Sequence, residues 1–283
     1  MKQVRTITVL GAGTMGHGIA HAAASSGFET RMYDVSDAAV SKGRAQIENV
    51  FKKSVELGKA TAADADASLA RLSATTDLAA ALAGTDFVIE AAPEKIDLKL
   101  DLMAAIDRHA PADAVVSTNT SALSITEMAG ASKNASRVAG MHFFNPVHRM
   151  KLVEIVRALE SSPEALETVE AVARRMGKDT VVVRESPGFI TSRVNASIGN
   201  EAFFMLMEGV ASARDIDKAL KLGLNHPMGP FELVDLVGLD TRLSILEYLH
   251  RSLGEKYRPC PLIAQYVKAG RLGRKVGRGV YEY

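Results

Sequence analysis

Three glycines and an aspartate form the first pattern in the sequence that points to a chemistry. The spacing Gly11-x-Gly13-x-x-Gly16 follows a short apolar run, and Asp34 ends a second run after an intervening helical stretch. Strand, tight turn, helix and strand in this order are typical of a dinucleotide-binding unit. Gly11 allows the turn, Gly13 lets the backbone approach a pyrophosphate, and Gly16 lets the helix pack closely on the strand. The pyrophosphate is expected at the helix N-terminus, with Met15 of the turn beside the cofactor.

The carboxylate of Asp34 predicts which dinucleotide is bound. At the end of the second strand it can accept hydrogen bonds from both ribose hydroxyls, and its charge would repel a 2′-phosphate. Arg31 is the nearby cation, but side chains alternate along a strand, so Arg31 shares the face of Tyr33 and not that of Asp34. The sequence therefore favours NAD over NADP.

Polar residues at 90–94, 119–121 and 141–146 follow three further predicted strands at the same edge of the sheet. Among the seven histidines, His142 is the one at the end of a predicted strand beside the dinucleotide. When a dinucleotide takes a hydride from an alcohol, a base must take the hydroxyl proton, and histidine suits this role because it titrates near neutral pH. A hydrogen-bonded core histidine is the alternative, and position alone does not decide between the two.

Glu154 favours the catalytic alternative for the histidine. Its carboxylate lies within the apolar run 152–156, where an unpaired buried charge is costly. A histidine from the adjacent strand would pair with it, would be held in one tautomer and would be stabilised when protonated. Ser121 and Asn119 follow another strand end at this edge. Capping of the next helix is the alternative for Ser121 or for Ser124.

The elements that must position these residues alternate between strands and helices as far as residue 183. This alternation predicts an α/β fold with a Rossmann-like, mostly parallel sheet and helices on both faces. From residue 191 to 279 the periodicity is helical only. We therefore predict a Rossmann-like domain at residues 1–186 and an all-helical domain at 187–283. The strands expected after the glycine unit lie at 71–74, 86–92, 114–119, 138–143, 153–156 and 180–183, and the main helices at 38–57, 94–109 and 163–177.

The composition argues against several classes of protein. A formal net charge of +1 gives no overall field toward nucleic acid or an acidic membrane, so neither is expected as a partner. The sequence contains no run of about 18 apolar residues, so no membrane span is expected. The first strand occupies the place of a signal peptide and Cys260 is the single cysteine, which together favour a cytoplasmic location. No metal site is expected, because the chain has no HxH, HExxH or CxxC motif.

Six segments together resemble the 3-hydroxyacyl-CoA dehydrogenases, and most of all the single-function bacterial 3-hydroxybutyryl-CoA dehydrogenases. The resemblance implies NAD-dependent oxidation of (S)-3-hydroxyacyl-CoA to 3-oxoacyl-CoA, or the reverse, with 3-hydroxybutyryl-CoA and acetoacetyl-CoA as the short-chain substrates. It also implies a homodimer built mainly through the helical domain. The likeness continues into residues 273–281. The six segments are 11–16, 117–121, 140–147 with its specific HFFNP sequence, 151–154, 186–189 and 226–233.

The same resemblance implies roles for individual residues. His142 matches the family's catalytic base and lies against the cofactor, Glu154 matches the paired acid, and Ser121 matches a group that contacts the substrate oxygen and the nicotinamide. Asn145 in the HFFNP segment is a further candidate for substrate binding. Coenzyme A is bound in the family by the helix and loop after the second strand, where the match here is poor. The candidates for binding coenzyme A are Lys53 and Lys59, for which a solvated helix face is the alternative. The residues that match cofactor-binding positions of the family are Glu94, Lys99, Asn119 and Lys275.

The segment after Gly188 departs from the pattern of the family. Many relatives have an active-site asparagine where this chain has Ser192. The shorter serine can bind the substrate's oxygen directly only if the backbone lies closer, and otherwise a water must bridge them. The alternative is that Ser192 caps the first helix of the second domain.

Two other functions fit parts of the sequence. A hydroxyacid or sugar-acid dehydrogenase also joins a Rossmann domain to a helical one, but we find no candidate catalytic lysine before an asparagine in the helical domain. A non-catalytic NAD-binding or structural protein is the second alternative. The presence of His142, Glu154 and Ser121 together argues against it.

Overall fold

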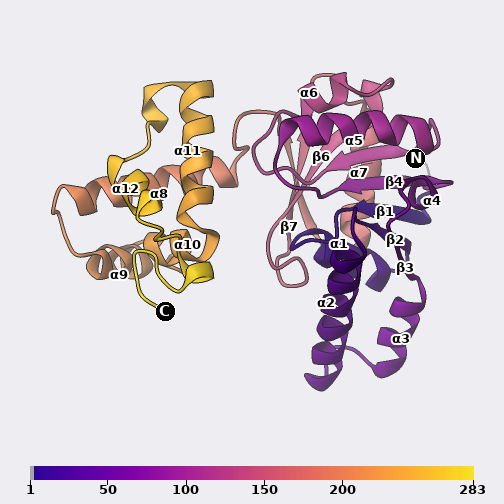
Figure 1. Ribbon diagram of the computed structural model, residues 1–283, viewed down its shortest axis with the longest axis horizontal. Coiled ribbons are helices and arrows are strands. Elements are labelled where there is room, and N and C mark those ends of the chain that lie inside the picture. Colours follow the sequence, from indigo (N-terminus) through magenta and orange to yellow (C-terminus); the bar gives the residue numbers. More distant parts are fainter. Residues whose placement is uncertain (1–2) are drawn as a thin grey trace. The chain divides into compact units, whose positions relative to one another are not determined.

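The computed structural model describes residues 3–283, which divide into two compact units. The first unit ends at Glu185 and the second spans Ser186–Tyr283. In Figure 1 the sheet of the first unit carries indigo to pink colours, and the helices at the end of the second unit are yellow. Each unit has its own cluster of buried apolar side chains.

The first unit is built on an eight-stranded sheet in the order β3-β2-β1-β4-β5-β6-β7-β8. Neighbouring strands are parallel except β6 and β7, which are antiparallel. Because β7 and β8 are parallel to each other, both run against the other strands. The predicted α/β fold with a mostly parallel sheet is confirmed. The strands are β1 Thr6–Leu10, β2 Glu29–Tyr33, β3 Leu72–Thr75, β4 Phe87–Glu90, β5 Val115–Thr118, β6 Val138–Phe143, β7 Leu152–Arg157 and β8 Asp179–Arg184.

Helices cover both faces of this sheet. β2 and β4 flank β1 on opposite sides, so right-handed crossovers place α1 and α5 on opposite faces. α7 shares a buried apolar cluster with α1, to which β1 contributes Ile7 and Val9 and β7 contributes Val153 and Ile155. The reversal of strand order at β1 creates a crevice at the carboxyl ends of the strands, where open α/β sheets bind ligands. The helices are α1 Gly16–Ser25, α2 Asp37–Glu56, α3 Ala62–Ala70, α4 Leu78–Leu82, α5 Ile96–His109, α6 Ile125–Gly130 and α7 Pro163–Arg175.

Two predicted elements are shorter than expected, and both differences matter for the pocket. The helix predicted to begin at Glu94 begins at Ile96, because Lys95 at its N-cap has an extended backbone with φ −132° and ψ 120°. The strand predicted at 86–92 ends at Glu90. Residues 91–94 therefore form a turn at the carboxyl end of β4 instead of belonging to the strand or the helix.

The second unit is helical except at its end. The rings of Phe203, Phe231 and Tyr266 meet at its centre, with ring centroids 5.1 and 5.9 Å from that of Phe203. The predicted helical periodicity up to residue 279 is wrong for the last residues, where Gly273 pairs with Arg278 in an isolated antiparallel bridge. No helix within residues 3–283 is both long and apolar enough to span a membrane. The helices are α8 Thr191–Met207, α9 Ala213–Gly223, α10 Pro230–Val237, α11 Leu239–Leu253 and α12 Pro261–Lys268.

Two buried aspartates explain why the terminal segment folds back on the helices. Asp217 accepts hydrogen bonds from the Phe231 N–H and the Tyr281 hydroxyl, both at 2.8 Å. Asp235 accepts from the N–H groups of Val280 and Tyr281 at 2.8 and 2.9 Å. Burial raises the pKa of Asp217. These bonds satisfy backbone donors that a helix would have paired internally.

Candidate active site

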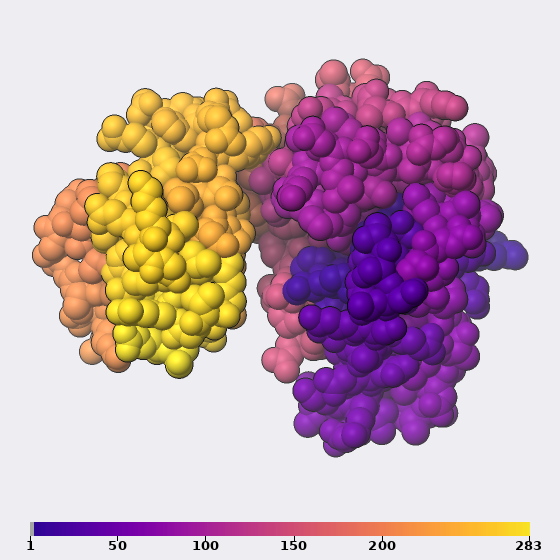
Figure 2. Space-filling model, in the orientation of Figure 1, coloured from indigo at the N-terminus to yellow at the C-terminus, as the bar shows by residue number. Residues whose placement is uncertain are grey.

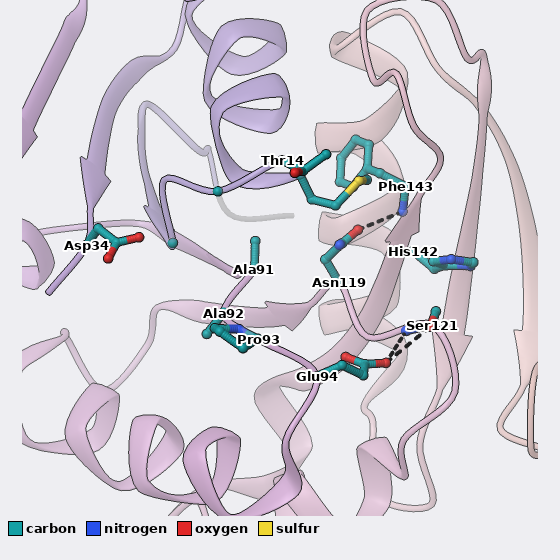
Figure 3. A pocket seen from close by; sticks show the side chains of 13 residues that line it. Thr14, Asp34, Ala91, Ala92, Pro93, Glu94, Asn119, Ser121, His142 and Phe143 are labelled. Atoms are coloured by element: carbon teal, nitrogen blue, oxygen red, sulfur yellow. Dashed lines mark hydrogen bonds between the residues drawn. The ribbon is translucent and has the colours of Figure 1, made fainter. Parts of the chain in front are cut away.

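A pocket of about 430 Å³ lies in the first unit at the carboxyl ends of the central strands. Figure 3 shows Asp34 at one end of its row of side chains and His142 at the other, with Asn119 between them and Ser121 below His142 in this view. Half of the residues that the sequence predicts for the site line this pocket. The lining residues are Gly11, Gly13, Thr14, Met15, Asp34, Ala91, Ala92, Pro93, Glu94, Asn119, Ser121, His142 and Phe143.

The three glycines of the first turn are required for different reasons. Gly11 has a φ of 114°, and a Cβ there would lie 2.6 Å from the carbonyl oxygen of Ala91. A Cβ on Gly16 would lie 1.8 Å from the carbonyl oxygen of Gly11. A Cβ on Gly13 would meet no atom within 4 Å, because this residue faces open space beside the pocket. The first and third glycines thus allow the turn to close, and the second leaves room for a pyrophosphate, as the sequence predicts.

The carboxylate of Asp34 is fixed where β2 ends. Oδ2 accepts a hydrogen bond from the Ala12 N–H at 2.8 Å, and Oδ1 accepts one from the Val35 N–H at 2.8 Å. The guanidinium of Arg31 instead donates to the carbonyl oxygens of Ala81 and Ala83. The negative charge at the ribose end of the pocket is therefore not neutralised by Arg31. This arrangement fits NAD, whose ribose hydroxyls donate hydrogen bonds to such a carboxylate.

His142 and Glu154 form the expected pair across β6 and β7. The antiparallel register places them directly opposite each other, and His142 Nδ1 is 2.7 Å from Glu154 Oε2. Glu154 is fully buried, and His142 is 6% exposed and lines the pocket. A carboxylate beside Nδ1 favours the histidine tautomer in which Nδ1 carries the ring proton. Nε2 is then the ring nitrogen with the lone pair that can take a proton.

Ser121 follows β5 and is held by Glu94. The Ser121 N–H and hydroxyl approach Glu94 Oε1 at 2.8 and 3.2 Å, and Figure 3 shows both contacts. The cap of α6 is Ser124, whose hydroxyl accepts from the Glu127 N–H at 3.1 Å. Helix capping, the alternative for these serines, therefore applies to Ser124 and is wrong for Ser121.

Asn119 joins the ends of two strands. Its side-chain oxygen accepts a hydrogen bond from the Phe143 N–H at 2.9 Å, and its own N–H donates to the Glu90 carbonyl at 2.7 Å. The pocket edge formed by β4, β5 and β6 is thereby tied together. Asn119 lines the pocket as the sequence predicts, with its amide oxygen engaged by the protein.

Lys99 lies beneath the pocket and does not line it. Its side chain is 1% exposed, and Nζ is 2.7 Å from Glu90 Oε1 and 3.6 Å from Glu94 Oε2. Sequence reasoning gave no separate role to Glu90. The signal that points to Glu154 is also present at Glu90, which is a carboxylate within an apolar strand and needs a partner.

Asn145, Lys53 and Lys59 lie outside the pocket. Asn145 is exposed and precedes a cis peptide bond to Pro146. Figure 1 shows α2 and α3 extending beyond the sheet, and in Figure 2 this purple part of the first unit forms a projecting lobe. Lys53 in the last turn of α2 and Lys59 after it are both exposed. Lys59 lines a second cavity of about 330 Å³ between α1, α2 and α3. Their roles in substrate binding stay predictions.

Lys275 and Ser192 belong to the second unit. Lys275 Nζ forms an ion pair with both carboxylate oxygens of Asp240, each at 2.6 Å. Ser192 is the second residue of α8, whose N-cap is Ile190. The alternative role of Ser192 as the helix cap is therefore wrong. α8 begins at Thr191, two residues earlier than a cap at Ser192 would require, because Gly188 and Phe189 make the preceding turn, with φ values of 72° and 49°.

Comparison with known proteins covers both units. The family model of the 3-hydroxyacyl-CoA dehydrogenase NAD binding domain matches residues 6–186, and that of the C-terminal domain matches residues 188–283. The chain belongs to the 3-hydroxyacyl-CoA dehydrogenase family. The predictions of NAD as cofactor and of an NAD-dependent dehydrogenase are thereby confirmed.

Individual 3-hydroxyacyl-CoA dehydrogenases match nearly the whole chain. A probable 3-hydroxybutyryl-CoA dehydrogenase of Bacillus subtilis is 46% identical over 99% of this chain and 98% of its own. The 3-hydroxybutyryl-CoA dehydrogenase of Bradyrhizobium diazoefficiens is 41% identical over 99% of this chain and 96% of its own. The crystal structure of (S)-3-hydroxybutyryl-CoA dehydrogenase from Ralstonia eutropha is similar with a TM-score of 0.96 and 45% identity, covering 99% of each chain.

Proposed function

We propose that the protein catalyses the reversible, NAD-dependent oxidation of (S)-3-hydroxybutyryl-CoA to acetoacetyl-CoA, with His142 as the general base. The observation that carries this proposal is the 2.7 Å contact between His142 and Glu154 in the pocket that begins at the glycine turn. The short acyl chain is supported by the names of the relatives, which are 3-hydroxybutyryl-CoA dehydrogenases.

The chain's own residues supply the acid–base chemistry. NAD, when bound, supplies the acceptor for the hydride that leaves C3 of the substrate. His142 Nε2 takes the proton of the C3 hydroxyl as the carbonyl forms, and returns it in the reverse reaction. The hydroxyl of Ser121 has one proton, and when substrate is bound it donates this proton to the same substrate oxygen in place of Glu94 Oε1. Proton and hydride leave the alcohol in the same conversion, so the base is required in the oxidation and the acid in the reduction.

Glu154 acts through the histidine. When His142 becomes an imidazolium, the carboxylate next to Nδ1 stabilises the new charge, and it also keeps the ring turned toward the pocket. Because both groups are buried, water screens their interaction poorly, and the carboxylate is correspondingly effective. Glu154 thus orients the base and takes no direct part in the proton transfer.

The second unit is proposed to bind substrate and to form a homodimer. Exposed apolar side chains of this unit support an interface between copies, and they include Leu222, Leu224, Leu236 and Val276. Ser192 is proposed to contact the substrate, and Lys275 the cofactor, because they match the corresponding positions of the family. Lys53, Lys59 and Asn145 are proposed contacts of the coenzyme A substrate. A single, buried cysteine, Cys260, supports a cytoplasmic location.

The test is turnover followed by NADH absorbance with acetoacetyl-CoA as substrate. We expect NADH to be consumed by the wild type, with kcat/KM lower for longer 3-oxoacyl-CoA substrates. Hydroxyacids and sugar acids with NAD are the comparison, because turnover of these alone would favour the rival dehydrogenase. NADH binding without turnover of any of these substrates would favour a non-catalytic NAD-binding protein.

A further inference from the structure

The loop that carries Ser121 depends on one oxygen of Glu94. Glu94 Oε1 accepts hydrogen bonds from the Thr120 hydroxyl at 2.6 Å, the Ser121 N–H at 2.8 Å and the Ser121 hydroxyl at 3.2 Å. The side chain of Glu94 is itself 41% exposed. An exposed carboxylate is solvated well when it turns into water, so these three bonds alone give it little reason to stay in one place.

Lys99 holds the other oxygen of Glu94 from below. Its Nζ lies 3.6 Å from Glu94 Oε2, 2.7 and 2.8 Å from the two oxygens of Glu90, and 3.3 Å from the carbonyl oxygen of Ala92. An ammonium group has three N–H donors, and these protein oxygens engage them. With 1% exposure, Lys99 has no surface left for a bound dinucleotide.

Glu90 fixes Lys99 and is itself fully bonded. It is completely buried, and besides Lys99 it accepts hydrogen bonds from the Thr118 hydroxyl at 2.6 Å and the Ala92 N–H at 2.6 Å. Its partners thus come from the end of β5, from the turn after β4 and from α5. A buried carboxylate with this many partners is held in one position, because losing Lys99 leaves its charge unpaired in the core and losing a neutral donor leaves an oxygen unsatisfied there.

We propose that Glu90 and Lys99 are a positioning pair that sets the hydroxyl of Ser121 by holding Glu94. Lys99 stands between two carboxylates, so without it Glu90 and Glu94 would repel each other and Glu94 would turn into solvent, releasing its three bonds to the loop. The resemblance implies that Lys99 binds the cofactor; its burial assigns it instead to the support beneath the pocket. This inference rests on the proposed function, in which Ser121 contacts the substrate oxygen.

The experiment is Lys99→Met, which keeps the length of the side chain and removes its charge. We expect kcat with acetoacetyl-CoA to fall about 10- to 100-fold, the loss typical of a reacting group displaced by about 1 Å. The dissociation constant of NADH should change less than about threefold, because Lys99 does not line the pocket. A Lys99 that bound the cofactor would give the reverse pattern, with weaker NADH binding and a smaller change in kcat.

The chain offers a matched control for the loss of a buried ion pair. Arg137 and Asp107 are paired with side chains 7% and 4% exposed, and Arg137 also donates to the carbonyl oxygen of Ala114, at the amino end of β5 and away from the pocket. Arg137→Met should lower the melting temperature at least as much as Lys99→Met and leave kcat unchanged. An equal loss of kcat in both variants would mean that general destabilisation explains the effect, and it would overturn the proposal.

A double-mutant cycle shows whether the pair acts through Ser121. In the Ser121→Ala background, Lys99→Met should lower kcat by less than about twofold, because the group being positioned is already gone. Full multiplication of the two losses would contradict the proposal.

Should Lys99→Met not fold, Thr118→Val removes one partner of Glu90 without unpairing a charge and must show the same dependence on Ser121. Wild-type enzyme that turns over no 3-oxoacyl-CoA would count against the proposed function, whereas active wild type with unchanged kcat in Lys99→Met would count against the pair.

Discussion

His142 and Glu154 occupy directly opposed positions on β6 and β7, at the one antiparallel pairing within the described sheet. The residues flanking them in the register, Met141 opposite Ile155 and Phe143 opposite Val153, are all buried. A slip of β7 by one residue would turn Val153 and Ile155 to the other face of the sheet, so the apolar core specifies the register. The geometry of His142 and Glu154 is therefore set by core packing.

The first prediction is that His142 and Glu154 act as one unit. His142→Ala should remove most of the roughly 10²–10⁴-fold contribution of a positioned base. Glu154→Gln should lower kcat with little change in NADH affinity, because the amide cannot stabilise an imidazolium as a carboxylate does. The loss in the double variant should be close to that of His142→Ala alone. Losses that multiply would show that the two residues act independently.

The second prediction concerns cofactor choice. Asp34→Asn keeps an oxygen acceptor for the Ala12 N–H and removes only the charge, which is what repels a 2′-phosphate. The wild type should strongly prefer NADH to NADPH in kcat/KM, and the variant should lose much of this preference. Asp37→Ala, an exposed acid in the first turn of α2, is the control and should leave the preference intact. Equal use of both cofactors by the wild type would refute the role given to Asp34.

Local spacing was enough to predict the glycine turn, the approximate positions of the strands and the partner of Glu154. These features follow from short-range rules, since a strand of known direction delivers its last residues to a known edge of the sheet. The reversal of β7 was not predicted, because strand direction depends on pairing between residues far apart in the chain. The burial of Lys99 was missed for the same reason. Nothing in its helix shows that Glu90 lies below it, and a lysine in a helix is usually solvated.

The third prediction is a pH dependence of stability that arises at His21, away from the pocket. Burial, and then the nearby His148, His17 and Lys178, lower the pKa of His21 to about 4. Neither ring nitrogen has a hydrogen-bond partner among the described residues. Since the unfolded chain has the ordinary value of about 6.5, it binds this proton first as the pH falls. His21 therefore does not affect the free energy of unfolding above about pH 6.5. As the pH falls toward 4, protonation of His21 lowers this free energy by up to about 3 kcal/mol.

Replacement of His21 by a ring that cannot titrate should remove this dependence. His21→Phe keeps the contact with Phe51, whose ring centroid is 4.3 Å away. The free energy of unfolding should then fall less between pH 7 and pH 5 than in the wild type, as measured by urea denaturation. His109→Phe changes an exposed histidine and is the control. A wild-type slope that persists in His21→Phe would rule out His21 as its source.

The fourth prediction concerns a charge in the core of the second unit. Arg242 is 1% exposed, burial lowers the pKa of its guanidinium to about 10, and within residues 3–283 no carboxylate forms an ion pair with it. Its Nε is buried without a hydrogen-bond partner among the described residues. An apolar side chain of similar length removes the cost of burying this charge, so Arg242→Met should raise the stability by about 1–3 kcal/mol. A lower melting temperature would contradict this expectation.

The last prediction tests Ser192, where this chain departs from the family. Ser192 is not the cap of α8. Ser192→Ala should therefore not cost the roughly 0.5–2 kcal/mol of stability that is typical when an N-cap is lost. The melting temperature should therefore change little. If the hydroxyl binds the substrate's oxygen in the transition state, kcat/KM with acetoacetyl-CoA should fall, by a factor of about ten for each 1.4 kcal/mol of lost interaction. Ser197→Ala is the matched control, because Ser197 lies on the same helix and its hydroxyl donates to the Arg193 carbonyl at 3.0 Å. Unchanged kinetics in Ser192→Ala would remove Ser192 from the proposed site.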